Sequence, residues 1–455
     1  MTCGMCMCVL AICLLILEVT DVNSLSDPAK RVCVIGAGYS GLGTARHLTE
    51  HGVNYTVFEA SRHIGGTWRF DPQAGRDQDG LPLYTSMYKQ LRTNTPRQTM
   101  EYVGYKFPED TPTYPTGDCF YKYLKSFAKH FNLLKNIQLQ SLVTSVGWAG
   151  DHWDLTYMKT DTKENITEVC DFVVVANGIC HKVAMPKFEG QDVFKGKMIH
   201  SHDYKEAEPY RNRRVLLIGA GASGLDLATH LCNVTSKLFH SHHLKYNQPF
   251  FSDNYLKKPD IKTFTDNGAI FEDDSTEEFD DVIFCTGYDF DHPFITETTG
   301  VTTSKKFVLP LYQQVVNIKH PSMAFVGVSK KVINRVLEAQ GEYAAMLAAG
   351  KFELPSQEEM LRNWLDHVHT LRWERKMKLV DVNVVPDMDQ YFGNLTREAG
   401  VNRAPPVLTS IRDFNAKNRL EDLLNYRDYD YKIVDNFNYE RFYNPRKELS
   451  CPFEG

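Results

Sequence analysis

The stretch that decides the fold is Arg31-Val-Cys-Val-Ile-Gly-Ala-Gly-Tyr-Ser-Gly41, an apolar run followed by glycines in the pattern Gly-x-Gly-x-x-Gly. The apolar run predicts a buried strand, and the stripe of Leu42, Ala45 and Leu48 predicts a helix directly after the glycines. Tyr55-Thr-Val-Phe-Glu59 predicts a second strand. Strand, glycine turn, helix and strand in this order are typical of a dinucleotide-binding fold.

A second unit of the same kind has its glycine turn 183 residues after the first one. Its apolar run, Arg214-Val-Leu-Leu-Ile218, leads into Gly219-Ala-Gly-Ala-Ser-Gly224, and Lys237-Leu-Phe-His240 predicts the following strand. The helical stripe between them is formed by Leu225, Ala228 and Leu231. Two copies of one unit predict two nucleotide-binding folds in this chain of 455 residues, a length that suits two or three domains.

Further apolar runs complete the predicted organisation. Asp171-Phe-Val-Val-Val-Ala-Asn-Gly178 and Asp281-Val-Ile-Phe-Cys-Thr-Gly287 each predict a buried parallel strand. Met323-Ala-Phe-Val-Gly327 precedes a helical pattern around residues 340–347. The acidic stretch Phe271-Glu-Asp-Asp-Ser-Thr-Glu-Glu278 predicts a surface loop. The polar, tyrosine-rich sequence after about residue 385 indicates no function.

The simplest architecture that follows is α/β, with two Rossmann-like dinucleotide-binding domains, the second inserted into the first. We expect residues 25–205 to begin the first domain and residues 206–320 to form the second. Residues 321–455 would then complete the first domain and add a C-terminal segment.

The glycines of each turn have a mechanical role. The first permits a tight turn, the second lets the backbone approach a pyrophosphate, and the third lets the helix pack on the strand. The N-terminus of the helix then faces the phosphates. The residues that we expect to bind cofactor in this way are Gly36, Gly38 and Gly41 in the first unit, and Gly219, Gly221, Ser223 and Gly224 in the second.

The end of the second strand separates the two sites. Glu59 lies 23 residues after Gly36, where a carboxylate accepts hydrogen bonds from a ribose and repels a 2′-phosphate, so the first site suits FAD or NAD. The second unit has His242 at this offset, beside Ser241, and no carboxylate in residues 237–252. A hydroxyl and imidazoles suit a 2′-phosphate, so we expect NADPH there rather than NADH. The alternatives are a solvated surface cluster and, less favoured, a metal site.

One segment between the two units carries a family resemblance. It reads Phe194-Lys-Gly-Lys-Met-Ile-His-Ser-His-Asp-Tyr204, and its pattern Phe-x-Gly-x-x-x-His-x-x-x-Tyr resembles the fingerprint of the class B flavin-dependent monooxygenases. Ile64-Gly-Gly-Thr-Trp68 and Phe284-Cys-Thr-Gly-Tyr288 resemble two further segments of that family, and the resemblance covers about residues 30–350. Tyr204 favours the branch that oxygenates nitrogen or sulfur, because related Baeyer–Villiger enzymes usually have Trp there.

The resemblance implies roles for single residues. Asn94 is similar to the family's asparagine beside the flavin ring, where its amide would donate a hydrogen bond to activated oxygen or hold water there. The alternative is a turn in which this side chain caps local backbone. Gln340 falls where the family has a Gln-containing helix that faces the first domain. The other residues implied at the cofactor sites are Gly66, Thr67, Trp68, His200 and Tyr204, of which His200 and Tyr204 are expected to shape the link between domains.

The resemblance also implies the chemistry. NADPH would reduce FAD by hydride transfer, and the reduced flavin would activate O2 and pass one oxygen atom to a tertiary amine. The chain is most similar to the secreted insect members of the family, which N-oxidise plant pyrrolizidine alkaloids. The animal enzymes usually carry Arg shortly after the serine at the 2′-phosphate site, whereas this chain reads Ser241-His-His, which leaves the strictness for NADPH open.

Three other functions remain as alternatives. A Baeyer–Villiger or sulfide monooxygenase would use the same cofactors, and a secreted FAD-binding protein would keep the fold without the chemistry. A flavin disulfide reductase is disfavoured, because the Cys-x-x-Cys pair that it needs occurs only at Cys3 and Cys6, within the predicted leader.

Composition limits the partners. Lys and Arg total 51 and Asp and Glu total 57, so the net charge is −6 and no polybasic face is indicated for nucleic acid or anionic lipid. Hydrophobic content of 42% is ordinary for a folded protein. We therefore expect no nucleic-acid partner. The family resemblance implies a small-molecule amine and O2 as partners, and self-association is left open.

Residues 1–24 resemble a signal peptide, because the apolar stretch at residues 9–17 is too short to span a bilayer and small residues precede Leu25. Sequons at Asn54, Asn165, Asn233 and Asn394 add weak support for secretion. The seven cysteines after the leader have no regular spacing, so we expect at most one disulfide. The final residues do not resemble an anchor, so we expect a secreted glycoprotein without a membrane anchor.

Overall fold

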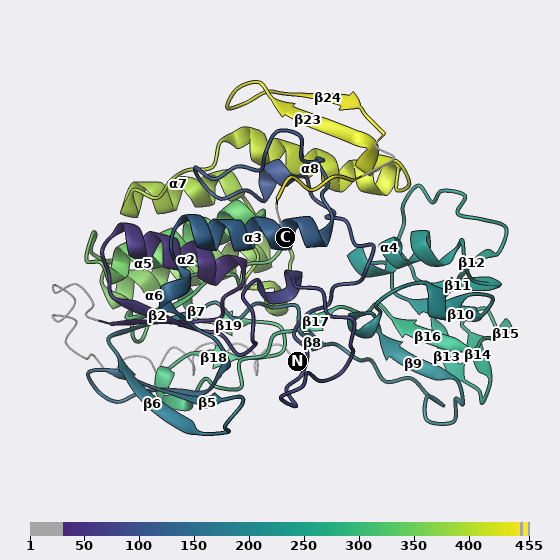
Figure 1. Cartoon of the computed structure of the whole chain (residues 1–455), viewed down its shortest axis with the longest axis horizontal. Coiled ribbons are helices and arrows are strands. Elements are labelled where there is room, and N and C mark those ends of the chain that lie inside the picture. Colours follow the sequence, from purple (N-terminus) through teal and green to yellow (C-terminus); the bar gives the residue numbers. More distant parts are fainter. Residues whose placement is uncertain (1–30, 446–448, 454–455) are drawn as a thin grey trace.

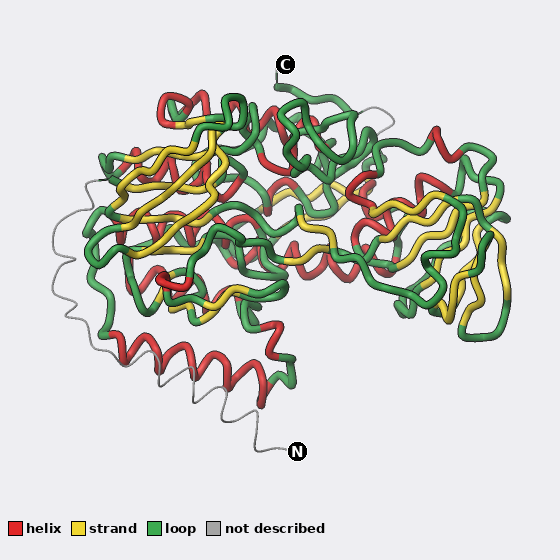
Figure 2. The backbone as a smooth tube through the Cα atoms, turned by 90° about the horizontal axis from the view of Figure 1, so that it is seen from below, coloured by secondary structure: helices red, strands yellow, loops and turns green. Residues whose placement is uncertain are grey.

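A computed structural model describes residues 31–445 and 449–453. Two lobes of unequal size lie side by side, and each contains a β-sheet (Figures 1 and 2). The predicted leader falls outside the described residues, so the structure does not bear on it. Among the described residues, no helix is long and apolar enough to cross a membrane.

The larger lobe is built on a seven-stranded sheet. Its strand order is β20 (Leu311–Tyr312), β21 (Val316–Asn317), β22 (Met323–Phe325), β7 (Phe172–Val175), β1 (Val32–Ile35), β2 (Tyr55–Phe58) and β3 (Ile137–Gln138). Strands β22 to β3 are parallel. The side chains of β1 alternate between two cores: Val32 and Val34 face one, and Cys33 and Ile35 face the other. Burial on both faces explains why this strand is apolar throughout.

The smaller lobe contains a five-stranded parallel sheet. Its order is β12 (Tyr255–Lys258), β11 (Lys237–Ser241), β10 (Arg214–Ile218), β16 (Asp281–Phe284) and β9 (Lys197–His200). All its strands lie in sequence between β7 and β22, which are neighbours in the first sheet. The second domain is therefore inserted into the first, and the predicted α/β architecture is confirmed.

The chain passes between the lobes at other positions than expected from the sequence. The boundaries were expected after residue 205 and after residue 320, and strand pairing differs from both. β9 already belongs to the second sheet, whereas β20 and β21 already belong to the first. The segments that cross between the lobes pair with each other as β8 (Lys182–Val183) and β17 (Tyr288–Asp289). A strand's domain depends on its pairing partner, which a local sequence pattern does not reveal.

Helices cover one face of the first sheet, and a small antiparallel sheet covers the other (Figure 1). Helix α2 (Tyr39–Glu50) packs on α5 (Asn334–Ala348), and the predicted stripe of Leu42, Ala45 and Leu48 is fully buried. The other helices of this lobe are α3 (Gly117–His130), α6 (Gln357–His369), α7 (Met388–Ala399) and α8 (Pro406–Glu421). The antiparallel sheet consists of β4 (Ser141–Trp148), β5 (Trp153–Lys159) and β6 (Asn165–Cys170).

In the smaller lobe, helix α4 (Ala222–Leu231) follows β10, and its predicted stripe is buried. A second antiparallel sheet consists of β13 (Ile261–Phe264), β14 (Gly268–Phe271) and β15 (Thr276–Glu278). The prediction of a surface loop for residues 271–278 is wrong in part, because β14 ends there and residues 276–278 form the exposed edge strand β15. An edge strand with solvent on both sides needs no apolar pattern, so its polar sequence concealed it.

The C-terminal segment is ordered structure that the sequence did not reveal. After α8, strands β23 (Tyr429–Ile433) and β24 (Tyr439–Tyr443) form an antiparallel hairpin that lies beside α8 (Figure 1). Phe414 of α8 lies close to the rings of Tyr431 and Tyr439, with ring centroids 6.4 Å apart in each pair. These aromatic contacts explain the abundance of tyrosine in this segment.

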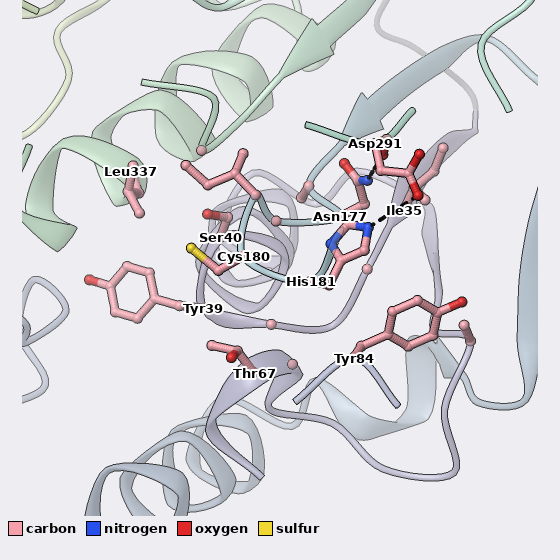
Figure 3. Close-up of a pocket in the computed structure, with 18 of the residues that line it drawn as sticks. Ile35, Tyr39, Ser40, Thr67, Tyr84, Asn177, Cys180, His181, Asp291 and Leu337 are labelled. Atoms are coloured by element: carbon pink, nitrogen blue, oxygen red, sulfur yellow. Dashed lines mark hydrogen bonds and ion pairs between the residues drawn. The ribbon is translucent and has the colours of Figure 1, made fainter. Parts of the chain in front are cut away.

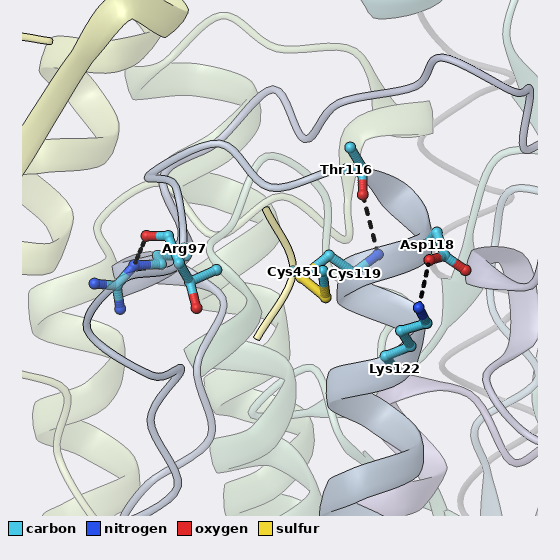
Figure 4. The surroundings of a disulfide bond; sticks show 7 residues. Arg97, Thr116, Asp118, Cys119, Lys122 and Cys451 are labelled. Atoms are coloured by element: carbon cyan, nitrogen blue, oxygen red, sulfur yellow. Dashed lines mark hydrogen bonds and ion pairs between the residues drawn. A yellow bond between two sulfur atoms is a disulfide. The ribbon is translucent and has the colours of Figure 1, made fainter. Parts of the chain in front are cut away.

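Two disulfides link distant parts of the first lobe, so the expectation of at most one is wrong. Cys33 in β1 is bonded to Cys170 at the end of β6, and both are fully buried. Cys119 in α3 is bonded to Cys451, which ties the chain's end to that helix (Figure 4). The pairs are 137 and 332 residues apart in sequence, so only the folded chain brings them together.

Candidate functional site

The first glycine turn has the close packing expected of a phosphate cradle. Gly36 has a φ of +100°, and a Cβ there would lie 2.7 Å from the carbonyl oxygen of Ala176 at the end of β7. A Cβ on Gly41 would lie 1.8 Å from the carbonyl oxygen of Gly36. Only glycine fits either position. Gly38 is less crowded, because its nearest neighbour would be Gly66 Cα at 3.6 Å.

The second turn repeats this geometry. Gly219 has a φ of +98°, and its Cβ would lie 2.7 Å from the carbonyl oxygen of Cys285, just after β16. A Cβ on Gly224 would lie 1.9 Å from the carbonyl oxygen of Gly219. A Cβ on Gly221 would meet no atom within 4 Å, so the protein leaves open the space in front of it. Both turns therefore have the three-part construction predicted from the sequence.

Each turn ends at a helix whose first turn has no cap of its own. The N-cap residues are Gly38 for α2 and Gly221 for α4, and neither supplies a side-chain hydrogen bond. Neither helix has an acidic residue in its first turn. The free N–H groups and the helix dipole therefore favour an anionic group at both ends, as the pyrophosphate of a dinucleotide requires.

A cavity of about 520 Å³ opens at the first turn (Figure 3). Several predicted residues line it, namely Gly36, Gly38, Glu59, Gly66, Thr67 and Trp68. Its walls also come from the start of α2, the loop after β7 and the loop before α5. A cavity that begins at an uncapped helix N-terminus and is otherwise mostly apolar suits a dinucleotide with one extended ring system.

Glu59 stands at the end of β2 and lines this cavity. Its carboxylate accepts hydrogen bonds from the backbone N–H groups of Ala37 at 2.8 Å and Ser61 at 2.9 Å. Burial raises the pKa of Glu59, and these two hydrogen bonds oppose that rise. A carboxylate has about four acceptor positions, so the remaining ones are free to accept ribose hydroxyls.

The segment Gly66–Trp68 forms a short 3-10 helix against the first glycine turn. Thr67 Oγ1 lies 3.1 Å from Ser86 Oγ, and the Thr67 carbonyl accepts a hydrogen bond from Thr85 Oγ1 at 2.9 Å. The Trp68 ring packs on Phe120 of α3 with centroids 4.3 Å apart. The predicted Gly-Gly-Thr-Trp segment thus forms one wall of the cavity, and these contacts hold it in position.

The sequence reasoning missed the wall formed by the loop after β7. Asn177, Cys180 and His181 line the cavity together with Asp291 (Figure 3). Asn177 Nδ2 donates to the Asp291 carbonyl at 2.9 Å, and His181 Nε2 lies 3.8 Å from Asp291 Oδ2. These contacts join the loops that follow β7 and β17. The glycine that ends the predicted strand, Gly178, was the sequence signal for this wall.

Gln340 supports the cavity without lining it. It is fully buried in α5, and its Oε1 accepts a hydrogen bond from the Gly327 N–H at 3.1 Å. Its Nε2 donates to Ser329 Oγ at 2.7 Å and to Tyr391 OH at 3.0 Å. Gly327 and Ser329 do line the cavity. Gln340 therefore holds the wall in place from behind.

Asn94 is half-buried and does not line the cavity at the first turn. Its carbonyl accepts a hydrogen bond from Asn415 Nδ2 of α8 at 2.9 Å. The preceding Thr93 carbonyl accepts one from Arg427 Nε at 3.1 Å. The structure thus connects this loop with the C-terminal segment, a contact that the sequence did not indicate.

His200 and Tyr204 lie in the smaller lobe, near the link between the lobes. His200 ends β9, and its ring lies 5.3 Å from that of Tyr288 in β17. Burial lowers the pKa of His200 to about 4, so the ring is neutral near pH 7. The Tyr204 ring is buried against Tyr88 and Tyr210. Neither side chain lines the cavity at the first turn.

Of the histidines at the end of β11, His240 and His242 are buried, whereas His243 is exposed. His240 is bonded on both sides, to Tyr255 OH and to the Gly219 carbonyl, each at 3.0 Å. Ser241 Oγ donates to the Pro259 carbonyl at 2.8 Å. Neither ring nitrogen of His242 has a hydrogen-bond partner in the described part of the chain, and burial lowers its pKa to about 4. Within residues 31–445 and 449–453, no cluster of three His, Cys, Asp or Glu side chains is arranged to hold a metal ion.

Sequence comparison now identifies the family. The model of the family described as flavin-binding monooxygenase-like matches residues 29–245 and 252–409, which is most of the chain. The chain belongs to this family. It is therefore a flavin-dependent monooxygenase that uses FAD and NADPH.

Individual relatives agree with this assignment. The chain is 54% identical to senecionine N-oxygenase of Tyria jacobaeae over 438 residues, which cover 95% of this chain and 96% of that protein. It is 29% identical to flavin-containing monooxygenase 3 of Homo sapiens, with 79% of this chain and 82% of that protein covered. The structure of S-allyl-L-cysteine S-oxygenase from Allium sativum superimposes with a TM-score of 0.80 at 28% identity, covering 88% of this chain and 94% of that one.

Proposed function

We propose that this monooxygenase N-oxygenates tertiary amines of the pyrrolizidine alkaloid class, such as senecionine. The observation that carries the proposal is the 54% identity with senecionine N-oxygenase along nearly the whole of both chains. Tyr204 at the end of the fingerprint segment agrees with oxygen transfer to nitrogen or sulfur. A tertiary amine has a lone pair that attacks an electrophilic oxygen directly, so the chain needs no acid and base pair for the transfer.

The two glycine turns would hold the two cofactors. In this proposal Gly36, Gly38 and Gly41 approach the pyrophosphate of FAD, and Glu59 accepts its ribose hydroxyls. Gly219, Gly221, Ser223 and Gly224 approach the pyrophosphate of NADPH, with Ser241 and His242 near its 2′-phosphate. The fit rests on the uncapped N-termini of α2 and α4 and on the open space at Gly221. When bound, the flavin accepts hydride from NADPH and activates O2.

The chain's own residues would then position groups and exclude water. Gly66, Thr67 and Trp68 cover one side of the cavity, and Asn94 would donate its amide hydrogen bond at the reacting oxygen. Gln340 keeps Gly327 and Ser329 in place, and His200 and Tyr204 keep the link between lobes in shape. A closed, dry site prevents the activated oxygen from being lost as H2O2.

The test is a stoichiometry. The purified protein should be yellow, and it should form one N-oxide per NADPH oxidised when senecionine is supplied. An absorption spectrum, NADPH oxidation and mass spectrometry of the product measure these quantities together. NADPH oxidation that yields only H2O2 with senecionine would reject the substrate class. A thioether and a cyclic ketone supplied in parallel identify a sulfide or a Baeyer–Villiger monooxygenase instead.

We also infer that the protein is secreted as a glycoprotein. Two disulfides in the described part of the chain favour an oxidising compartment. Asn54, Asn165 and Asn233 are exposed, whereas Asn394 lies within α7 and its Oδ1 accepts a hydrogen bond from Arg397. Expression in insect cells should give a protein in the medium that begins at Leu25. Treatment with an N-glycosidase should reduce its mass, and retention inside the cells would contradict secretion.

A further inference from the structure

A buried ion pair joins the C-terminal segment to the smaller lobe. Arg427, just before β23, donates from Nη1 to Asp226 Oδ1 of α4 at 2.6 Å. The Tyr88 hydroxyl donates to the other oxygen of Asp226. The side chains of Arg427 and Asp226 are 14% and 9% exposed, so water screens their attraction little. The carboxylate thus receives one partner from the C-terminal segment and one from the first lobe.

Arg427 also binds the first lobe through its other nitrogens. Its Nε donates to the Thr93 carbonyl at 3.1 Å, and its Nη2 donates to the Arg92 carbonyl at 3.3 Å. One guanidinium therefore binds both a helix of the smaller lobe and a loop of the larger lobe. Its planar set of five donors makes such a geometry rigid, which the single ammonium group of a lysine would not do.

The two elements joined by Arg427, helix α4 and the loop before Asn94, are those whose relative position matters for the proposed reaction. Asp226 lies in the second turn of α4, which begins at the second glycine turn. Thr93 precedes Asn94, and the Asn94 carbonyl is itself held by Asn415 of α8. The helix that would hold NADPH and the loop of Asn94 are therefore both fastened to the C-terminal segment.

Asp226 is expected to stay ionised beside Arg427. Burial is the largest influence on the pKa of Asp226 and raises it, but the charges of Arg427 and His230 and the hydrogen bonds from Tyr88 and Arg427 together outweigh burial, so this pKa lies below its ordinary value. A buried pair of this kind contributes little net stability compared with apolar packing, yet it fixes one geometry, because either partner alone would be left buried and charged.

We propose that Arg427 is a positioning residue for hydride transfer, which sets the smaller lobe against the larger one so that the two cofactors meet. The inference rests on the proposed placement of NADPH at α4. It assigns a function to the segment after residue 385, for which the sequence indicated none. Misplacement of reacting groups by about 1 Å costs up to about 100-fold in rate.

The test is the rate of flavin reduction by NADPH without oxygen, followed by stopped-flow absorbance on the FAD-loaded protein. Arg427→Gln should slow reduction at saturating NADPH by about 10- to 100-fold, while FAD content stays at the wild-type level. Arg427→Lys should recover only part of the rate, because it keeps the charge but not the planar contacts. Arg441→Gln is the matched control: it removes an arginine of the same segment that packs on Phe414 and Tyr429, and it should leave the rate unchanged.

A merely structural role would give a different result. In that case Arg427→Gln would lower the melting temperature but reduce flavin at the wild-type rate, and the proposal would be overturned. If Arg427→Gln does not fold, Asp226→Asn and Tyr88→Phe decide by the same measurement, since each keeps the size of its side chain. Wild-type protein that does not reduce its flavin with NADPH would instead reject the placement of NADPH at α4.

Discussion

Asn94 follows a carbonyl held by Arg427, and its own carbonyl is held by Asn415, so its backbone is fixed from two sides. We expect Asn94→Asp to keep FAD bound, because the substitution changes no residue of the first glycine turn. A carboxylate cannot donate the amide hydrogen bond and adds a negative charge beside the reacting oxygen. The N-oxide formed per NADPH should fall about tenfold or more, with H2O2 taking its place. Asn94→Asp protein with fully coupled amine oxidation would show that Asn94 has no such role.

At the scale of single residues, the sequence predicted what depends on local geometry. The glycines and Glu59 are recognisable because a tight turn and a strand end at fixed spacing leave few other choices. The wall made by Asn177, His181 and Asp291 was missed, because its contacts join loops more than 100 residues apart. The placement of a phosphate at Ser241 and His242 stays a prediction. The burial of the neighbouring His240 could not be predicted locally, because its partner Tyr255 lies on another strand.

Among the elements, α2 can lie close to the turn that follows β1 because Gly41 has no Cβ. A Cβ on Gly41 would lie 1.8 Å from a backbone oxygen that cannot move without opening the turn. Gly41→Ala should therefore cost about 3 kcal/mol or more of folding free energy and abolish FAD retention. Gly393→Ala, in α7, meets no atom within 4 Å and should stabilise the protein by about 0.5–1 kcal/mol. Thermal denaturation and the flavin-to-protein absorbance ratio measure both, and equal effects of the two substitutions would contradict the packing argument.

The elements that the sequence predicted are buried strands and helices with an apolar stripe. β1, β7 and β22 are apolar throughout, β10 and β16 are apolar after their first residues, Arg214 and Asp281, and α2, α4 and α5 carry apolar stripes, so each is confirmed. The hairpin β23–β24 and α8 were missed, because each has a polar, exposed face, and the aromatic contacts between them join residues that lie far apart in the sequence. Their positions depend on tertiary contacts, which local propensity does not contain.

For the whole molecule, the inserted second domain followed from two copies of one unit and an apolar run after the second. The disulfides could not be predicted, because each pair is set by which surfaces the folded lobe brings together. The burial of the histidines could not be predicted either, because it also depends on the folded structure. Burial lowers the pKa values of His200, His242, His292 and His320 to about 4, and that of His240 to about 3.

These buried histidines predict how stability depends on pH. The unfolded chain binds their protons near pH 6.5, whereas the folded chain does so only near pH 4, so folding stability should fall as the pH drops between these values. His47 acts in the opposite sense, because its pKa is raised. His292 is the cleanest case, since neither ring nitrogen has a partner in the described chain and its ring contacts Phe290, Phe294 and Phe325.

His292→Phe removes one of these titrations while keeping an aromatic ring among its phenylalanine neighbours. The FAD-loaded variant should lose less stability than wild type between pH 7 and pH 4.5, with a gain of at most about 3 kcal/mol at the acid end. Denaturant unfolding of the variant and of the wild-type protein at several pH values measures the difference in their free energies of unfolding. Parallel pH profiles for the two proteins would mean that His292 is already charged, or bonded to water, in the folded state, and that other groups govern the acid response.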